Sequence, residues 1–361
     1  MVNPLRRALL LATLLPGAPR ADDGGVRRGR ELHFPRDHGA HPATAIEWWY
    51  ATGWLGTEAA PRYGFQITFF RSKTGLAQDN TGRFAARHVL FSHAALTDLA
   101  SKRHEHSQRL VRWSGRDDTH DAAARPDTHV RIGTWSFRRE ALPTPRYVAR
   151  VDGALTLDLS LARTQPLLLQ GDAGFSRKGP DQTSASHYYS EPQLLANVQL
   201  TRNGRTESAM GRAWLDHEWS QGLLHHEAVG WDWIGFNLHD GSALMAFQMR
   251  RSDGSALWAG GSYRRRGEAA RIFAASEVRL RPGRRWRSPA SGVTWPVQWT
   301  LDTPVGRFQV DALLDAQELD NRASTGTLYW EGLSQLLDDQ QRVVGLGYLE
   351  LTGYGQRLTL G

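Results

Sequence analysis

Short apolar or alternating runs, rich in Val, Leu, Phe, Trp and Thr, follow one another from residue 46 onward, with Gly, Asp or Asn between them. Runs of this length, bounded by turn residues, predict β-strands. The dipeptides Asn203-Gly204, Asp240-Gly241 and Asp253-Gly254 lie between such runs and supply the positive φ of tight hairpins. No long segment keeps a helical period, although residues 327–339 (TLYWEGLSQLLDD) are ambiguous. The pattern therefore predicts an all-β, antiparallel protein built of sandwiches or barrels.

The length of 361 residues suits two domains of ordinary size or one large one, and 40% hydrophobic residues can supply a core. Residues 169–192 are rich in Gly, Ser, Pro and other polar residues and separate two β-rich portions. A long loop of this kind is usually either functional or a connection between domains. We expect an N-terminal domain over residues 22–205 and a C-terminal domain over residues 206–361.

Composition excludes several classes of function. The chain has no cysteine, which rules out disulfides, thiolate nucleophiles and cysteine-based zinc or iron–sulfur sites. The net charge is +7, but the basic residues are nearly all arginines scattered along the chain. Nucleic-acid binding needs basic residues gathered on one surface, so we expect no nucleic-acid partner.

The N-terminus has the order of a secretory signal. A basic pair, Arg6 and Arg7, precedes an apolar run over residues 8–15 and a stretch of small residues over 16–21. The apolar run is too short to span a bilayer. We expect residues 1–21 to be a bacterial signal peptide cleaved near Ala18 or Ala21, which would place the protein in the periplasm or outside the cell. A disordered N-terminal tail is the alternative.

Glu47 lies in the most aromatic short run of the chain, AIEWWYATGWLG (residues 45–56). In a strand, alternation would place it on one face with Trp49, and Trp48 and Tyr50 on the other. Both faces are largely apolar, so the strand is packed between layers or lines a cavity, and Glu47 needs a partner. Two interpretations stay open: an ion pair with an arginine at the end of the strand, or a site carboxylate beside Trp48.

A second acidic and aromatic run, AWLDHEWSQG (residues 213–222), would project Trp214, Asp216 and Glu218 from one face of a strand and His217 from the other. Two carboxylates spaced in this way lie about 6.5 to 7 Å apart. Where water is limited, each discourages ionisation of the other, which raises a pKa and leaves a general acid protonated near neutrality. The alternative is an acidic pair neutralised by arginine on an exposed face.

A third run, GWDWIGFNLHDG (residues 230–241), would place Asp232 on an apolar face opposite Trp231 and Trp233. Asp232 is then either buried and paired or part of a cavity wall. Nearby candidates are Tyr188 in HYYSEP and His93 in FSHAALTD. A single histidine among apolar residues is more often a core group with satisfied hydrogen bonds than a ligand.

Familiar catalytic signatures are missing. The sequence has no HExxH helix, no GxSxG elbow and no phosphate-binding glycine loop. The runs Asp216-His217-Glu218 and His225-His226-Glu227 could suggest a metal, but neighbouring side chains on a strand point to opposite faces. We expect no metal and no cofactor.

Eight segments, taken in order, resemble the carotenoid 1,2-hydratase (hydroxyneurosporene synthase) superfamily, in its secreted lipocalin-like branch known as "predicted secreted hydrolase". They are HFPRDHGAHPATAIEWWYATGWL (33–55), GFQITFFRS (64–72), FSHAALTD (91–98), GFSRKG with ASHYYSEPQL (174–194), GRAWLDHEWS (211–220), GWDWIGFNLHDGSALMAFQMR (230–250), YWEG (329–332) and GLGYLELTGY (345–354).

The resemblance implies two lipocalin-like antiparallel β-barrels packed together, with a ligand pocket among aromatic residues. Relatives include hydratases of isoprenoid double bonds and cyclases of polyketide-like products. By this analogy Asp216, in the W-x-D-H pattern, matches an acid that protonates an alkene, with Trp214 as its aromatic neighbour. Glu218 and His217 would tune this acid or position water. The implied pocket lining is Glu47, Trp48, Trp214, Trp231, Asp232, Trp233, Tyr188 and His93.

The sequence thus predicts an exported protein that binds a small hydrophobic ligand of isoprenoid, lipid or polyketide-like type. It would hydrate or hydrolyse this ligand by acid catalysis. The alternative is a non-catalytic periplasmic carrier, since an aromatic pocket suits plain binding equally well. Peripheral contact of the basic surface with anionic lipid and the oligomeric state stay open.

Overall fold

The computed structural model describes residues 25–153 and 155–359. Within these ranges the regular structure consists of strands and two short 3-10 helices, η1 (Arg36–His38) and η2 (Ala275–Glu277). None of the helices in this part of the chain has the length and hydropathy needed to cross a bilayer. The predicted signal peptide, residues 1–21, lies outside the described residues.

The first sheet is antiparallel and nearly closes on itself. Its strands are β1 (Ile46–Gly56), β2 (Pro61–Lys73), β3 (His88–Asp98), β4 (Arg103–Trp113), β5 (Ala122–Ala123), β6 (His129–Ile132), β7 (Trp135–Glu140), β8 (Arg146–Val151), β9 (Leu155–Ala162), β10 (Leu168–Leu169), β11 (Phe175–Arg177), β12 (Ala185–Arg202) and β13 (Arg205–Ser220). The order is β4-β3-β2-β1-β13-β12-β9-β8-β7-β6-β5, with β10 and β11 on β12. Because β6 contacts β3 and β4, the two ends of this order come together as in a barrel.

The second sheet is also antiparallel. Its strands are β14 (Gly230–Leu238), β15 (Ala243–Arg250), β16 (Ala256–Arg264), β17 (Arg271–Phe273), β18 (Arg279–Pro282), β21 (Gln298–Thr303), β22 (Gly306–Ala312), β23 (Glu318–Asn321), β24 (Thr327–Leu337) and β25 (Val343–Thr352). The order is β17-β16-β15-β14-β25-β24-β22-β21-β18, with β23 on β24. A short ribbon of β19 (Arg285–Arg287) and β20 (Thr294–Pro296) stands apart.

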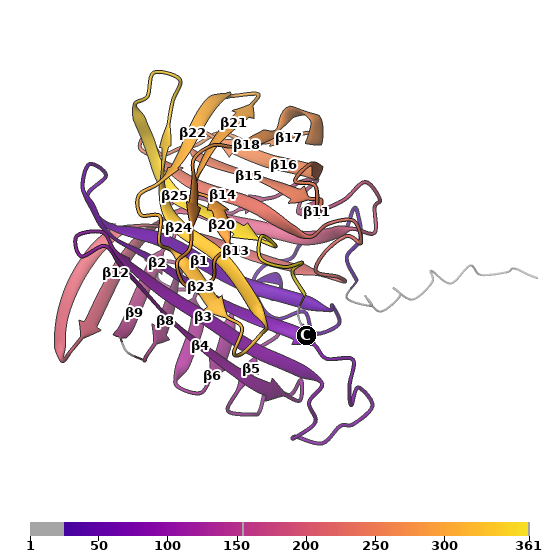
Figure 1. Ribbon diagram of the computed structural model, residues 1–361. Coiled ribbons are helices and arrows are strands. Elements are labelled where there is room, and N and C mark those ends of the chain that lie inside the picture. The colour runs from indigo at the N-terminus through magenta and orange to yellow at the C-terminus, as the bar shows by residue number, and fades with distance from the viewer. Residues whose placement is uncertain (1–24, 154, 360–361) are drawn as a thin grey trace, which may run out of the picture.

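The two sheets pack against each other through their central strands. β1 and β2 contact β25 and β24, and β13 and β12 contact β14. Figure 1 shows the orange and yellow strands of the second sheet stacked on the indigo to pink strands of the first. The predicted fold, two antiparallel barrel-like units packed together, is therefore confirmed.

Strand alternation produces three apolar cores. In β1, Trp49 and Leu55 enter the core inside the first sheet, whereas Tyr50 and Trp54 enter a core between the sheets. In β14, Ile234 belongs to the core inside the second sheet, while Trp233 again joins the core between them. The central strands are therefore covered on both faces, which explains why their sequences are apolar on both.

The predicted hairpin turns are confirmed. Asn203-Gly204 joins β12 to β13, Asp240-Gly241 joins β14 to β15, and Asp253-Gly254 joins β15 to β16, and the three glycines have positive φ. The ambiguous segment at residues 327–339 is resolved as strand β24, with pairing partners on both sides.

The polar segment at residues 169–192 is not a connection between the sheets. It contains β11 and the start of β12, both within the first sheet. The chain leaves the first sheet after Ser220 and enters the second at Gly230. These are boundaries of sheets, and the division into domains at residue 205 stays a prediction.

Candidate active site between the two barrels

A cavity lies between the two sheets and has an empty volume of about 1040 Å³, including its open mouth. Strands β1, β2, β3, β12 and β13 form one wall, and β14, β15, β24 and β25 form the other. Aromatic residues dominate both walls: Trp48, Tyr50, Phe70, Phe91, Tyr188, Trp231, Trp233, Phe247 and Tyr329.

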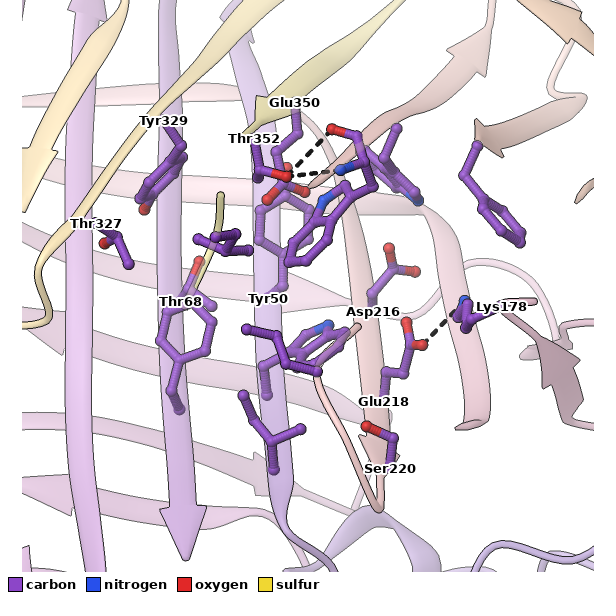
Figure 2. A pocket seen from close by; sticks show the side chains of 18 of the residues that line it. Tyr50, Thr68, Lys178, Asp216, Glu218, Ser220, Thr327, Tyr329, Glu350 and Thr352 are labelled. Atoms are coloured by element: carbon purple, nitrogen blue, oxygen red, sulfur yellow. Dashed lines mark hydrogen bonds and ion pairs between the residues drawn. The ribbon is translucent and has the colours of Figure 1, made fainter. Parts of the chain in front are cut away.

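The pairing register explains which side chains reach the cavity from the first sheet. Tyr50 of β1 lies opposite Asp216 of β13, and Trp48 lies opposite Glu218. Directly paired residues project from the same face of a sheet. The pairing of EWWY in β1 with DHE in β13 therefore brings two aromatic rings and two carboxylates side by side to the cavity. Figure 2 shows Tyr50, Asp216 and Glu218 in this arrangement.

Asp216 is 2% exposed and makes three hydrogen bonds. Its Oδ1 accepts from the Ser190 hydroxyl at 2.5 Å and from the Trp214 indole at 2.7 Å, and its Oδ2 accepts from the Tyr188 hydroxyl at 2.8 Å. Burial raises the pKa of the carboxyl from 3.8 to about 7, although these hydrogen bonds oppose the shift. A carboxyl with such a pKa is partly protonated at neutral pH and can give its proton to a bound molecule.

Glu218, the second carboxylate of β13, has a cation as its partner. Lys178, which follows β11, places its Nζ 2.9 Å from Glu218 Oε1. The same Nζ lies 4.7 Å from the centre of the Tyr188 ring and 4.3 Å from that of Phe247, within cation–π range. Figure 2 shows this ion pair beside Asp216. One cavity carboxylate is thus held as an ion pair, while its neighbour Asp216 has only neutral partners.

Tyr188 connects Asp216 to the second sheet. Its hydroxyl donates to Asp216 and accepts from the indole Nε1 of Trp233 at 3.1 Å. Trp233 also packs edge-on against Tyr50, with 5.4 Å between ring centres. A Cβ at position 235 would lie 2.3 Å from the Trp233 ring, so Gly235 leaves the room that this indole occupies.

A second carboxylate pair lies on the opposite wall. Glu331 of β24 and Glu350 of β25 are direct cross-strand partners, so both side chains leave the same face of the sheet. Burial raises the pKa of Glu331 well above its ordinary value, and the charge of Glu350 adds to the shift. Burial also raises the pKa of Glu350 to about 8, with the charges of Asp216 and Glu218 contributing. The cavity therefore contains acidic groups on both walls.

Two further polar groups complete the cavity. The Nδ1 of His93 is hydrogen-bonded to the Tyr329 hydroxyl at 2.8 Å, and burial lowers the pKa of His93 to about 3. Burial and the charge of Glu331 raise the pKa of Tyr50 well above its ordinary value. His93 and Tyr50 are therefore neutral at physiological pH.

Glu47 lies on the opposite face of β1, away from the cavity. Arg71 Nε donates to its Oε2 at 2.9 Å, and nitrogens of His41 and His217 lie 2.7 and 3.0 Å from its Oε1. Burial alone would raise the pKa of Glu47, but His41, His217 and Arg71 lower it well below its ordinary value. Glu47 thus differs from its expected place in the pocket, whereas His217 lies on the face of β13 opposite Asp216, as predicted. Both belong to a buried ionic network, and the interpretation of Glu47 as the partner of an arginine fits its position.

The His41, Glu47 and His217 group offers ligand atoms close enough together to hold a metal ion. Each of these atoms already takes part in a hydrogen bond within the network, and the Arg71 guanidinium lies at hydrogen-bond distance from the carboxylate. His41 also stacks on Trp219, with 3.7 Å between ring centres. The residues therefore fit a proton-bearing network better than a divalent cation.

A second such group, His225-His226-Glu227, lies in the connection between the sheets. The Nε2 of His225 is paired with Asp181 at 3.0 Å, and its Nδ1 accepts from the backbone of Glu227 at 3.1 Å. Both nitrogens of this histidine are therefore engaged, and the Glu227 carboxylate is paired with Arg251 Nε at 3.1 Å.

Asp232 faces the interior of the second sheet. It accepts from Gln248 at 2.7 Å and from Tyr354 at 2.8 Å, and Arg250 Nε lies 3.4 Å away. Its position differs from the expected place in the cavity wall and matches the alternative of a buried, paired carboxylate. Trp48, Trp231, Tyr188, Trp233 and His93 line the cavity, and Trp214 contacts it through Asp216.

The sequence did not single out Lys178, Tyr50, Glu331 or Glu350 as cavity residues. Glu331 and Glu350 lie in the motifs YWEG and GLGYLELTGY, at apolar-flanked positions like that of Glu47. A carboxylate among apolar residues is therefore the sequence feature that could have identified both glutamates as candidate cavity residues. The pairing of the two glutamates depends on strand register, which local sequence does not reveal.

These features define an all-β protein of two packed barrels with an acidic, aromatic cavity between them. The chain belongs to the AttH-like family, whose model matches residues 25–354. It is similar to a crystal structure assigned to AttH from Nitrosomonas europaea, at 43% identity and a TM-score of 0.83, covering 91% of this chain and 99% of that one.

Two other solved structures share the fold at 14% identity. Kievitone hydratase from Nectria haematococca has a TM-score of 0.66 over 92% of this chain and 95% of its own. CghA bound to Sch210972 has a TM-score of 0.52 over 87% and 89%. A comparison with curated proteins found no match. The fold expected from the resemblance is confirmed, and the family that is shown is AttH-like.

Proposed function

We propose that this protein is an exported hydratase that adds water to a double bond of a hydrophobic, isoprenoid-like ligand, with Asp216 as the acid. The observation that carries the proposal is Asp216 itself, a buried carboxyl with a pKa raised to about 7 in an aromatic cavity between the barrels. A general acid works best when its pKa lies near the working pH.

The chemistry follows from the groups around the cavity. Protonated Asp216 gives its proton to one carbon of the alkene, and the adjacent carbon becomes a tertiary cation. The faces of Trp48, Trp231 and Tyr50 can stabilise this positive charge through their ring quadrupoles. Trp48 and Trp231 lie nearly parallel, 6.4 Å between ring centres and 13° between planes, so they offer a stacked surface. Water then adds to the cation and releases one proton, which gives an alcohol.

Lys178 and Glu218 have supporting roles in this proposal. The negative charge of Glu218 favours the protonated form of Asp216, and Lys178 fixes the position of Glu218 through the ion pair. Lys178 also covers the rings of Tyr188 and Phe247, which orders the chain after β11 at the side of the cavity.

The relatives support this choice without identifying the substrate. By its name, kievitone hydratase hydrates kievitone, and the present chain shares its fold. The cavity of the present chain has apolar walls and several acidic groups with one lysine, which favours an uncharged ligand. The predicted N-terminal signal supports export to the periplasm, and peripheral membrane contact would bring a lipid-soluble ligand to the cavity.

The rival proposal is a carrier that binds the same kind of ligand without reaction. Dihydromyrcene, which has a trisubstituted double bond, and the variant Asp216→Asn separate the two. The hydratase converts dihydromyrcene to the tertiary alcohol dihydromyrcenol, and the variant binds the alkene but loses conversion. Asp232→Asn is the matched control, because it removes a buried carboxyl outside the cavity. Binding of the alkene without conversion by any of the three proteins supports the carrier instead.

A further inference from the structure

The two ends of the cavity differ in how their polar groups are satisfied. Around Asp216, both carboxylate oxygens accept hydrogen bonds. Toward β3 and β24, three buried polar atoms make no hydrogen bond of normal geometry in the described residues: the Tyr50 hydroxyl, His93 Nε2 and Glu331 Oε1. These three residues are 5%, 2% and 2% exposed. The Tyr50 hydroxyl lies near enough to the Glu331 carboxyl to act as a weak donor that lowers the pKa of Glu331, and both groups keep capacity for a guest. An unpartnered buried polar group costs about 1–3 kcal/mol, so this end favours a guest that supplies hydrogen bonds.

Glu331 and Glu350 give this end its acidic character. As cross-strand partners, their Cβ atoms lie about 5 Å apart. No basic side chain contributes to the electrostatic surroundings of either carboxyl within the described residues. Two carboxyls so placed ionise one after the other and share a proton between the two steps. A pair with one proton can both donate and accept a hydrogen bond, as can the Tyr50 hydroxyl.

We infer that Glu331, Glu350 and Tyr50 form the oxygen subsite of the cavity, which binds the hydroxyl group of a tertiary alcohol or the water from which that group forms. A hydroxyl group donates one hydrogen bond and accepts others, which matches the free capacity of Glu331 and Tyr50. Figure 2 shows Glu350 and Tyr50 close together, with Lys178 farther away at the right of the view. The apolar remainder of the ligand then lies along the tryptophan-lined part of the cavity.

This subsite rests on the proposed hydratase reaction for its chemical role. Asp216 loses its proton to the alkene, and water at the subsite forms the new carbon–oxygen bond. In the fraction of molecules whose glutamate pair has lost its first proton, the pair takes the proton that water releases. The electron pair of the double bond ends in the new carbon–hydrogen bond. The glutamate pair is then fully protonated and Asp216 ionised, and transfer of one proton from the pair to Asp216 restores the starting state.

A binding measurement tests the subsite independently of turnover. The probes are dihydromyrcene and dihydromyrcenol, which share a carbon skeleton and differ by the added water. Their dissociation constants are measured by tryptophan fluorescence for wild type, Glu331→Leu and Glu350→Leu. Asp232→Asn is the control, since it removes a buried carboxyl outside the cavity. Near-ultraviolet circular dichroism verifies that each variant is folded.

The wild type is expected to bind the alcohol more tightly than the alkene. Each leucine variant should reduce this preference about tenfold, the factor produced by losing one hydrogen bond to a charged group, and Asp232→Asn should keep it. An equal preference in the wild type and both leucine variants would overturn the subsite, as would loss of the preference in Asp232→Asn alone. Absence of binding of either probe would overturn it too. If the wild type prefers the alcohol and the leucine variants lose this preference, but no protein shows turnover, the subsite is supported and only the hydratase proposal is refuted.

Discussion

Replacing Asp216 with asparagine should change how the stability of the protein depends on pH. Burial raises the pKa of this carboxyl from 3.8 to about 7 in the folded protein. The folded state therefore binds the proton more tightly than the unfolded chain does. The carboxyl makes no unfavourable contribution at low pH, where it is neutral in both states. Its destabilising contribution grows as the pH rises above the unfolded value and is complete above about pH 7.

The size of this effect follows from the pKa shift. Each pKa unit corresponds to about 1.36 kcal/mol, and the shift of about three units gives ~4 kcal/mol. Asparagine has a similar shape and does not ionise, so it avoids this cost. The difference in the free energy of unfolding between the variant and the wild type should therefore shift by ~4 kcal/mol in favour of Asp216→Asn on going from about pH 4 to pH 8.

Urea unfolding followed by tryptophan fluorescence measures this difference, with linear extrapolation to water at each pH. Groups that titrate in both proteins largely cancel when the two free energies are subtracted. Asp232→Asn serves as a comparison, because Arg250, Gln248 and Tyr354 all oppose the effect of burial there. Parallel pH dependence in Asp216→Asn and wild type would refute the argument that burial holds this carboxyl protonated.

Three further changes give distinct results. Glu47→Gln should lower the free energy of unfolding by about 3–5 kcal/mol, because it leaves a buried guanidinium without its counter-charge. Lys178→Met should lower it by about 1–3 kcal/mol by leaving Glu218 without its cation; urea titration measures both. Tyr188→Phe removes a hydrogen bond that lowers the pKa of Asp216. Since the acid acts when protonated, the fall in hydration rate with rising pH should move to higher pH in a pH–rate profile.

The controls for the two stability predictions are exposed charges. Asp158→Asn breaks an ion pair in which both partners are about half exposed, and Lys102→Met removes an exposed lysine. Exposed pairs contribute about 0–1 kcal/mol. If Glu47→Gln or Lys178→Met cost no more than these controls, the buried networks described above would not contribute to stability as argued.

Strand alternation predicted the faces of the central strands correctly. It assigned Trp214, Asp216 and Glu218 to one face and His217 to the other, as the structure has them. This succeeds because side-chain direction in a strand depends only on position along it. Alternation also predicted correctly that the side chains of Glu47 and Trp48 project from opposite faces of their strand.

Which strands pair, and therefore which side chains meet, could not be predicted from the sequence. The partner of Glu47 is Arg71, its register neighbour on β2, and no local pattern identifies that strand. The glutamate pair likewise forms only when β24 and β25 align Glu331 with Glu350. Each carboxylate was visible as a polar residue in an apolar setting. Which of them meet, and on which side of a sheet, depends on register and on how the two barrels pack.

The origin of the product oxygen tests the central claim most directly. Wild-type protein and Asp216→Asn are incubated with dihydromyrcene in water enriched in heavy oxygen, and the product is analysed by gas chromatography and mass spectrometry. The account predicts dihydromyrcenol carrying one heavy oxygen from the wild type and none above background from Asp216→Asn. Equal amounts of labelled alcohol from both proteins would contradict the assignment of Asp216 as the acid.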